Sequence, residues 1–330
     1  MKKNIYYISW LQVIGPILVV LGHSLNGIEN YGAWYIFSKQ FIYIFHMPLF
    51  FFISGYLLSH NGWLKENTYK EFLSKKALRL LLPYFFWNIL MLLPKLMIES
   101  FLTESTPTDI FWIFKAFLFP RQNVLGHTWF LAALFIVFVF TPVWKKLLSC
   151  RSIQIYCTIF VGVLLYCLPL NSEFLCISDL HKDLLFFMIG IYAGNFSEDV
   201  FLKFINKTRC VWIISAIILT YLFLKYYYEL STLRFIPCLC IIMGILSVVT
   251  LLKNIDIKRV ANYSFGIYIL HWPIMLAIRI YLYQILKFNT SVCIAIMSIS
   301  GWLVPILVME VLRRILPQKF YKPFRYLMGV

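Results

Sequence analysis

The chain has 330 residues, of which 13% are charged and 61% hydrophobic, and its formal net charge is +16. Since a soluble domain carries about 25% charged residues, this composition excludes ordinary water-soluble domains, a disordered chain and a disulfide-stapled module. Apolar residues also fall in blocks of about 20, the length that crosses about 30 Å of hydrocarbon. The sequence therefore predicts an all-α, polytopic transmembrane helix bundle, with residues 1–330 forming a single integral-membrane domain.

Ten membrane spans are expected, an even number that places both termini on one side. Alternate loops on that side carry about three times as many lysines and arginines as the opposite loops, which predicts cytoplasmic termini. Because topology accounts for the basic charge, nucleic acid is not expected as a partner. The expected spans are residues 5–25, 37–58, 80–98, 128–144, 153–170, 184–195, 210–226, 234–252, 263–286 and 292–312.

The first span carries two polar residues of interest, His23 near its outer end and Gln12 near its inner end. Eleven helical steps of about 100° bring both side chains to one face, and the residues are about 16 Å apart along the axis. Titratable groups at membrane depth are functional candidates. Either this face serves a path or an elongated ligand between the two sides, or each residue only hydrogen-bonds a neighbouring helix.

His46 and His271 each stand two residues before a proline, Pro48 and Pro273. A proline leaves one carbonyl of the preceding helical turn without its N–H donor, and a nearby histidine can bond that carbonyl. For His271 we prefer this structural interpretation. His181, in a predicted outer loop, is expected to be solvated.

The segment GHTWFLAALF (126–135) opens the fourth span from the outer face. His127 and Trp129 either line an outward-facing pocket, with Trp129 stacking on a sugar, or belong to an aromatic belt at the interface. Just upstream, the amphipathic stretch 109–119 is expected to lie flat in the membrane interface.

Three cations, Lys75, Lys76 and Arg79, precede the third span and share a helix face. They either hold anionic lipid or a polyphosphate, for which the planar fork of Arg79 is well suited, or only set topology. No zinc-ligand spacing, glycine-rich phosphate loop or CxxC pair is present, so neither a metal nor a bound cofactor is predicted.

Six segments, spread in order over nearly the whole chain, resemble the integral-membrane acyltransferases of family three. That family includes bacterial O-acetyltransferases of surface polysaccharides, peptidoglycan and other glycans. The resemblance rests on ILVVLGHS, HMPLFFFISGYLL, LRLLLPYFFW, HTWFLAALF, FFMIGIYAG and YSFGIYILHWPI.

The resemblance implies transfer of an acyl group, usually acetyl, from cytoplasmic acyl-CoA to a hydroxyl of an extracytoplasmic glycan. Acetyl-CoA is then a co-substrate, and the location is a bacterial plasma or inner membrane, among membrane lipids. His23 matches the catalytic histidine, as general base or transient acyl carrier, and His46 matches a second motif histidine, as its partner or an acceptor-site residue. The basic group at positions 75, 76 and 79 is implied to meet the CoA phosphates.

One pair of positions departs from the family pattern. The family usually has Arg or Lys eleven positions before the first-span histidine, often with Asp three residues earlier, whereas this chain has Gln12 and Ser9. Gln12 can hydrogen-bond an amide of the pantetheine arm of CoA, but it supplies no cation. The alternative functions are a transporter or export component for a glycan or lipid-linked intermediate, without acyl transfer, and a signalling or scaffold protein.

Overall fold

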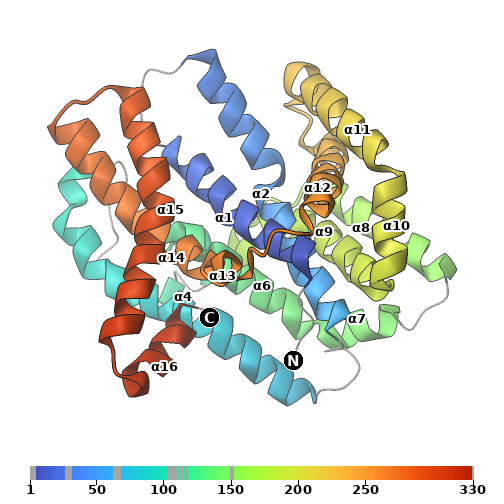
Figure 1. Ribbon diagram of the computed structural model, residues 1–330, viewed down its shortest axis with the longest axis horizontal. Helices are drawn as coiled ribbons and strands as arrows, with labels where there is room; N and C mark the ends of the chain where they lie inside the picture. Colours follow the sequence, from blue (N-terminus) through green and yellow to red (C-terminus); the bar gives the residue numbers. More distant parts are fainter. Residues whose placement is uncertain are drawn as a thin grey trace. The chain divides into compact units, whose positions relative to one another are not determined.

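The computed structural model describes residues 5–26, 32–61, 68–102, 118–148 and 152–328, together with Phe111, Phe114 and Lys115. Throughout these residues every regular element is a helix, which confirms the all-α prediction (Figure 1). The α-helices are α1 (Tyr6–Ser24), α2 (Ala33–His60), α4 (Tyr69–Met97), α6 (Trp129–Val139), α7 (Thr141–Leu148), α8 (Ser152–Cys167), α9 (Ile177–Asn195), α10 (Glu198–Lys207), α11 (Arg209–Leu222), α12 (Phe235–Val249), α13 (Lys258–Ala261), α14 (Ser264–Ile278), α15 (Thr290–Ile315) and α16 (Gln318–Leu327). The 3-10 and π segments are η1 (Glu99–Phe101), η2 (Pro120–Gln122), η3 (Gly126–Thr128), η4 (Phe174–Cys176), η5 (Phe223–Tyr227), η6 (Ser231–Leu233), η7 (Thr250–Leu252) and η8 (Arg279–Ile285).

Seven helical stretches in the described part of the chain are long and apolar enough to cross a membrane. They are Tyr6–Ser24, Ala33–His60, Tyr69–Met97, Arg209–Tyr227, Ser231–Leu252, Ser264–Ile285 and Thr290–Ile315. Two shorter apolar helices, Gly126–Val139 and Ile155–Cys167, correspond to the predicted fourth and fifth spans. The polytopic bundle is thus confirmed, while the total of ten spans and the cytoplasmic termini stay predictions. Most of the predicted interfacial stretch 109–119 lies outside the described residues.

The chain divides into two compact units whose segments interleave in sequence. The first unit comprises Met1–Glu66, Val143–Leu168 and His181–Ser264. The second unit comprises Asn67–Pro142, Pro169–Leu180 and Phe265–Val330. Neither unit is one continuous stretch of chain, and the single domain over 1–330 remains a prediction.

In the first unit, glycines let α2 and α9 approach backbone to backbone. A Cβ atom at Gly55 of α2 would clash with the carbonyl oxygen of Phe187, and one at Gly190 of α9 would clash with that of Phe52. Small residues permit this close approach between membrane helices. The crossing therefore holds α2, the helix that carries His46, firmly in the core of its unit.

Helices α1 and α2 also pack together in this unit. The Phe50 ring lies where a side chain at Gly15 would otherwise extend, and the buried hydroxyls of Tyr7 and Tyr56 share a hydrogen bond of 2.6 Å. These contacts set the spacing between the two helices that carry the motif histidines.

In the second unit, the buried Asn88 of α4 fixes the segment before α6. Its Nδ2 donates to the hydroxyl oxygen of Thr128 at 3.0 Å, and its Oδ1 accepts from the backbone N–H of Leu125 at 2.7 Å. A buried amide that is bonded at both ends holds its partners in one geometry. The segment that carries His127 is therefore positioned by α4.

Candidate functional site

His23 stands in the last turn of α1 and is half-buried. Its Nδ1 lies 3.4 Å from Nδ2 of Asn26, which follows the end of the helix, and the same amide nitrogen donates to the Tyr43 hydroxyl of α2 at 2.9 Å. A chain of polar contacts thus runs from α1 to α2 at the level of His23. Neither Asn26 nor Tyr43 was singled out from the sequence.

His46 is buried one turn further along α2, with the Tyr43 ring edge-on at a centroid distance of 4.8 Å. Its Nδ1 lies 3.0 Å from the carbonyl oxygen of Ile42. Pro48 leaves a different carbonyl, that of Ile44, without its helical donor. The structure therefore brings both motif histidines of the first unit against Tyr43, one through Asn26 and one by ring contact.

Gln12 and His23 lie on the single helix α1, as the shared-face argument requires. Gln12 is half-buried, and Pro16 leaves the Gln12 carbonyl without its intrahelical N–H donor. Ser9 is buried and donates to the carbonyl of Ile5 at 3.4 Å. These are the two positions that depart from the family pattern. Ser9 therefore bonds its own helix, and Gln12 offers both its side-chain amide and its main-chain carbonyl oxygen as hydrogen-bonding groups.

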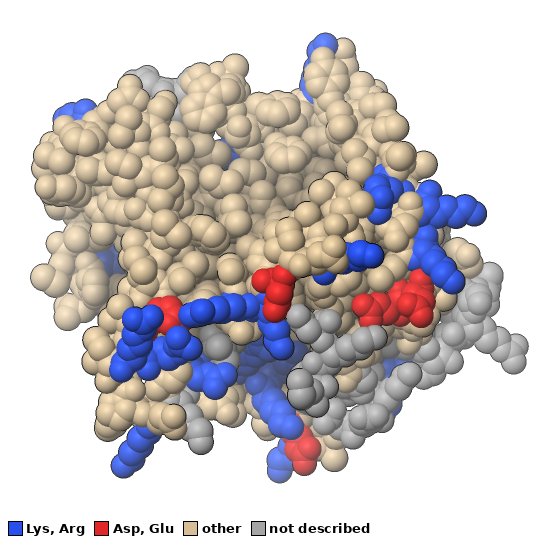
Figure 2. Space-filling model, in the orientation of Figure 1, with Lys and Arg blue, Asp and Glu red and all other residues tan. Residues whose placement is uncertain are grey.

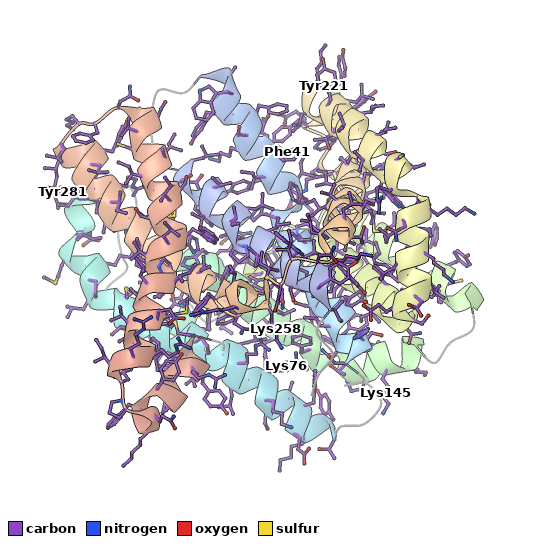
Figure 3. All side chains as sticks on the ribbon, viewed as in Figure 1. Phe41, Lys76, Lys145, Tyr221, Lys258 and Tyr281 are labelled. Atoms are coloured by element: carbon purple, nitrogen blue, oxygen red, sulfur yellow. The ribbon has the colours of Figure 1, made fainter. Side chains whose placement is uncertain are left out.

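The three cations on α4, in the second unit, are not equivalent. Lys76 (Figure 3) places its Nζ 3.9 Å from the ring centroid of Phe138 on α6 and 5.4 Å from that of Phe72. Such contacts are favourable cation–π interactions. Lys75 and Arg79, one helical turn apart, are exposed and are the cations of this group better placed to meet a phosphate.

Trp129, at the start of α6, is only 5% exposed, and an arginine lies over its ring. The guanidinium carbon of Arg121 lies 4.4 Å from the ring centroid, and Arg121 also binds both carboxylate oxygens of Asp179, at 2.5 and 2.6 Å. A sugar that stacks on this face of Trp129 would have to displace Arg121. The acceptor role of His127 and Trp129 stays a prediction.

A second histidine pair lies inside the second unit. The rings of His127 and His271 are 4.9 Å apart between centroids, and His271 is 0% exposed. His271 Nδ1 lies 3.1 Å from the carbonyl of Ile267, whereas Pro273 leaves the carbonyl of Ile269 without its donor. The expectation that His271 bonds the carbonyl freed by the proline was therefore wrong, because the carbonyl it faces lies two residues earlier, about half a helical turn away. The ring near the Ile269 carbonyl is that of His127.

The prediction that His181 is solvated was wrong, because His181 is only 6% exposed. Helix α9 begins at Ile177, earlier than the predicted span 184–195, and so takes up residues that were expected in a loop. Asp183 is buried with it, and Arg234 lies close to both Asp183 and the hydroxyl of Tyr166. The sequence did contain a signal for this ionic cluster. Asp183 stands at the edge of an apolar block, in a chain that has only 14 Asp and Glu residues.

The described residues offer two kinds of chemistry. A half-buried imidazole such as His23 can accept a proton from a hydroxyl, and exposed cations such as Arg79 can bind phosphate oxygens. No group of three or more His, Cys, Asp or Glu side chains among these residues is placed to hold a metal ion.

Comparison with known proteins identifies the family. The profile of the acyltransferase 3 family, described as an acyltransferase domain, matches residues 5–309. Two curated relatives are nodulation proteins NolL: that of Mesorhizobium japonicum is 34% identical over 125 residues, 37% of this chain and 31% of the relative. That of Sinorhizobium fredii is 35% identical over 130 residues, 38% of this chain and 32% of the relative. These matches span about a third of the relatives' length, and no solved structure matches the chain. Since the family profile covers nearly all of the sequence, the chain belongs to the acyltransferase 3 family of membrane acyltransferases.

Proposed function

We propose that the protein is a membrane O-acyltransferase that moves an acyl group, acetyl in the simplest case, from cytoplasmic acyl-CoA to a hydroxyl of an extracytoplasmic glycan. The observation that carries this proposal is the match to the acyltransferase profile over residues 5–309. We place the protein in a bacterial plasma or inner membrane as a multi-pass protein. No observation favours export without acyl transfer.

His23 is the proposed general base. Its Nε2 takes the proton of the acceptor hydroxyl while the hydroxyl oxygen attacks the acyl carbonyl. The C–S bond then breaks, and the CoA thiolate leaves with the proton that His23 Nε2 returns to it, which restores the neutral base. This role needs the neutral tautomer with its proton on Nδ1, so that Nε2 carries the lone pair. The alternative role, transient acyl carrier, predicts an acylated His23 that mass spectrometry of the stopped reaction detects.

Asn26 and Tyr43 are the proposed positioning residues for His23. A half-turn of the Asn26 amide, which exchanges its nitrogen and oxygen, directs Oδ1 at both His23 Nδ1 and the Tyr43 hydroxyl. Both of these groups can donate to that oxygen when the His23 proton is on Nδ1, so the His23 and Tyr43 donors are both satisfied. The structure places the amide nitrogen at 3.4 Å from His23 Nδ1 and 2.9 Å from the Tyr43 hydroxyl, and the exchange puts the oxygen at this position.

The other sites are assigned as follows. His46 is the partner of His23 or an acceptor-site residue. Arg79 and Lys75 bind phosphates of the donor, with Lys76 in a lesser role because it lies over Phe138. Gln12 hydrogen-bonds an amide of the pantetheine arm.

His127 and Trp129 are the proposed acceptor-binding residues. Trp129 takes part only when Arg121 moves off its ring. Removing the guanidinium, as in Arg121→Met, is therefore expected to change transfer to the acceptor and not the binding of CoA.

The test uses the purified full chain in lipid vesicles with acetyl-CoA labelled in the acetyl group. We expect release of CoA and, in cells that express the gene, surface glycans that carry additional acetyl groups by mass spectrometry. Movement of glycan without any turnover of acyl-CoA would contradict the proposal and support export.

A further inference from the structure

The last helix, α16 (Gln318–Leu327), has a basic side and an aromatic side. Positions 319, 322 and 325 share one helical face, and all three are Lys or Arg in the sequence. Phe320, Phe324 and Leu327 recur at the i, i+4, i+7 spacing of the opposite face. The helix follows residues 5–309, so it lies beyond the part of the chain that the family profile matches.

A second amphipathic helix, α10, serves as a comparison, because its apolar face is covered by protein. In α10 the apolar residues Phe201 and Ile205 are buried in the first unit. Two acidic residues, Glu198 and Asp199, balance the two lysines of that helix. The amphipathic pattern of α10 is therefore explained by packing within the protein.

Helix α16 differs from α10 in both respects. None of its described side chains is buried. The Phe320 ring on the aromatic side is 61% exposed, and the Tyr326 ring, which lies beside the cations, is 53% exposed. It has no acidic residue. Packing within the protein accounts for neither the exposed rings nor the unbalanced positive charge.

The position of α16 is set by α4 of the same unit. The indole N–H of Trp87 donates to the carbonyl of Leu327 at 3.1 Å, and the two helices pack together. Arg313 and Arg314 end the preceding helix α15, and both are exposed. Figure 2 shows Lys and Arg side chains gathered over the end of α15 and over α16.

We propose that α16 lies in the membrane interface and binds the headgroups of anionic phospholipids. Its rings insert among the lipids beside the headgroups, and its cations meet the lipid phosphates. Charge complementarity selects this occupant, because a basic helix with a separate aromatic side matches an anionic bilayer surface. The proposal does not depend on the acyltransferase activity.

Hydrogen exchange of the full chain in lipid nanodiscs tests this inference at the helix itself. We expect the peptide that contains α16 to exchange roughly tenfold more slowly in phosphatidylglycerol discs than in phosphatidylcholine discs. The double variant Lys319→Gln/Arg325→Gln should lose this difference. The matched variant Lys203→Gln/Lys207→Gln, which removes two exposed lysines from α10, should retain it.

Two further arms keep the result decisive. Phe320→Ser should weaken the protection without changing the charge. Equal exchange rates in the two lipids would overturn the proposal, as would an unchanged difference in the double variant. Inorganic phosphate is added to the phosphatidylcholine discs as the last arm. If it slows exchange of the α16 peptide as much as phosphatidylglycerol does, the ligand is a soluble anion and the lipid proposal is overturned.

Discussion

Two histidines, His23 of the first unit and His271 of the second, are held in different ways. In the first unit, His23 is half-buried and its Nδ1 faces the side-chain amide of Asn26. In the second unit, His271 is fully enclosed, its Nδ1 faces a main-chain carbonyl of its own helix, and its ring packs on His127. An imidazole beside a side chain at a partly open position can exchange a proton with a ligand, whereas an enclosed one contributes to packing. Residue type alone does not distinguish the two.

The largest expected effect tests the first unit. His23→Gln should lower acyl transfer by at least about 100-fold, because a general base contributes about 10²- to 10⁴-fold. The melting temperature in detergent should hardly change. His60→Gln is the matched control, since His60 is also half-buried at a helix end and stacks on Tyr56. Full activity in a folded His23→Gln protein would remove the catalytic assignment from the first unit.

The second expected effect concerns the enclosed histidine. His271→Leu should lower the free energy of unfolding by about 1–3 kcal/mol, because a buried hydrogen bond and its ring contact are lost. Acyl transfer per folded molecule should remain close to that of the unchanged protein. Thermal unfolding and activity measured on the same preparation check this. Loss of activity at an unchanged melting temperature would give the second unit a catalytic histidine as well.

A smaller effect is expected from the neighbours of His23. Asn26→Leu should reduce acyl transfer by about tenfold, roughly 1.4 kcal/mol, because His23 loses the partner that sets its tautomer. Tyr43→Phe should have a weaker effect in the same direction. Nitrogen NMR of labelled histidine reads the tautomer directly, even in an inactive protein. A His23 tautomer unchanged by Asn26→Leu would contradict the positioning role.

The smallest effects separate the cations of α4. Lys76→Met should destabilise the fold by about 0.5–1 kcal/mol through the lost cation–π contact and leave CoA binding nearly intact. Arg79→Gln should instead weaken CoA binding several-fold without affecting stability. Lys70→Gln, on the same helix and exposed, is the control for charge alone. Equal weakening of CoA binding by all three would indicate a general effect of net charge.

Much of the fold was predictable from the sequence, because a membrane imposes the length of the apolar block that crosses it. Seven of the ten predicted spans correspond to long apolar helices. Helical periodicity likewise places Gln12 and His23 on one face without any knowledge of their neighbours. The start of α9 was missed because Ser178 and Asp179 are typical of a loop. In the structure both residues are helical and half-buried, and His181 on the next turn is buried.

The contacts around the candidate residues depended on tertiary structure. Arg121 covers Trp129, His271 meets His127, and Tyr43 reaches the His23 region through Asn26. None of these pairs follows from spacing along one helix, because each joins segments whose approach is decided by packing. Local patterns in the chain determine where a helix forms and which residues share a face. Which side chain then lies against that face, and whether a histidine is enclosed or open, is decided when the helices pack, because packing sets burial and hydrogen-bond partners.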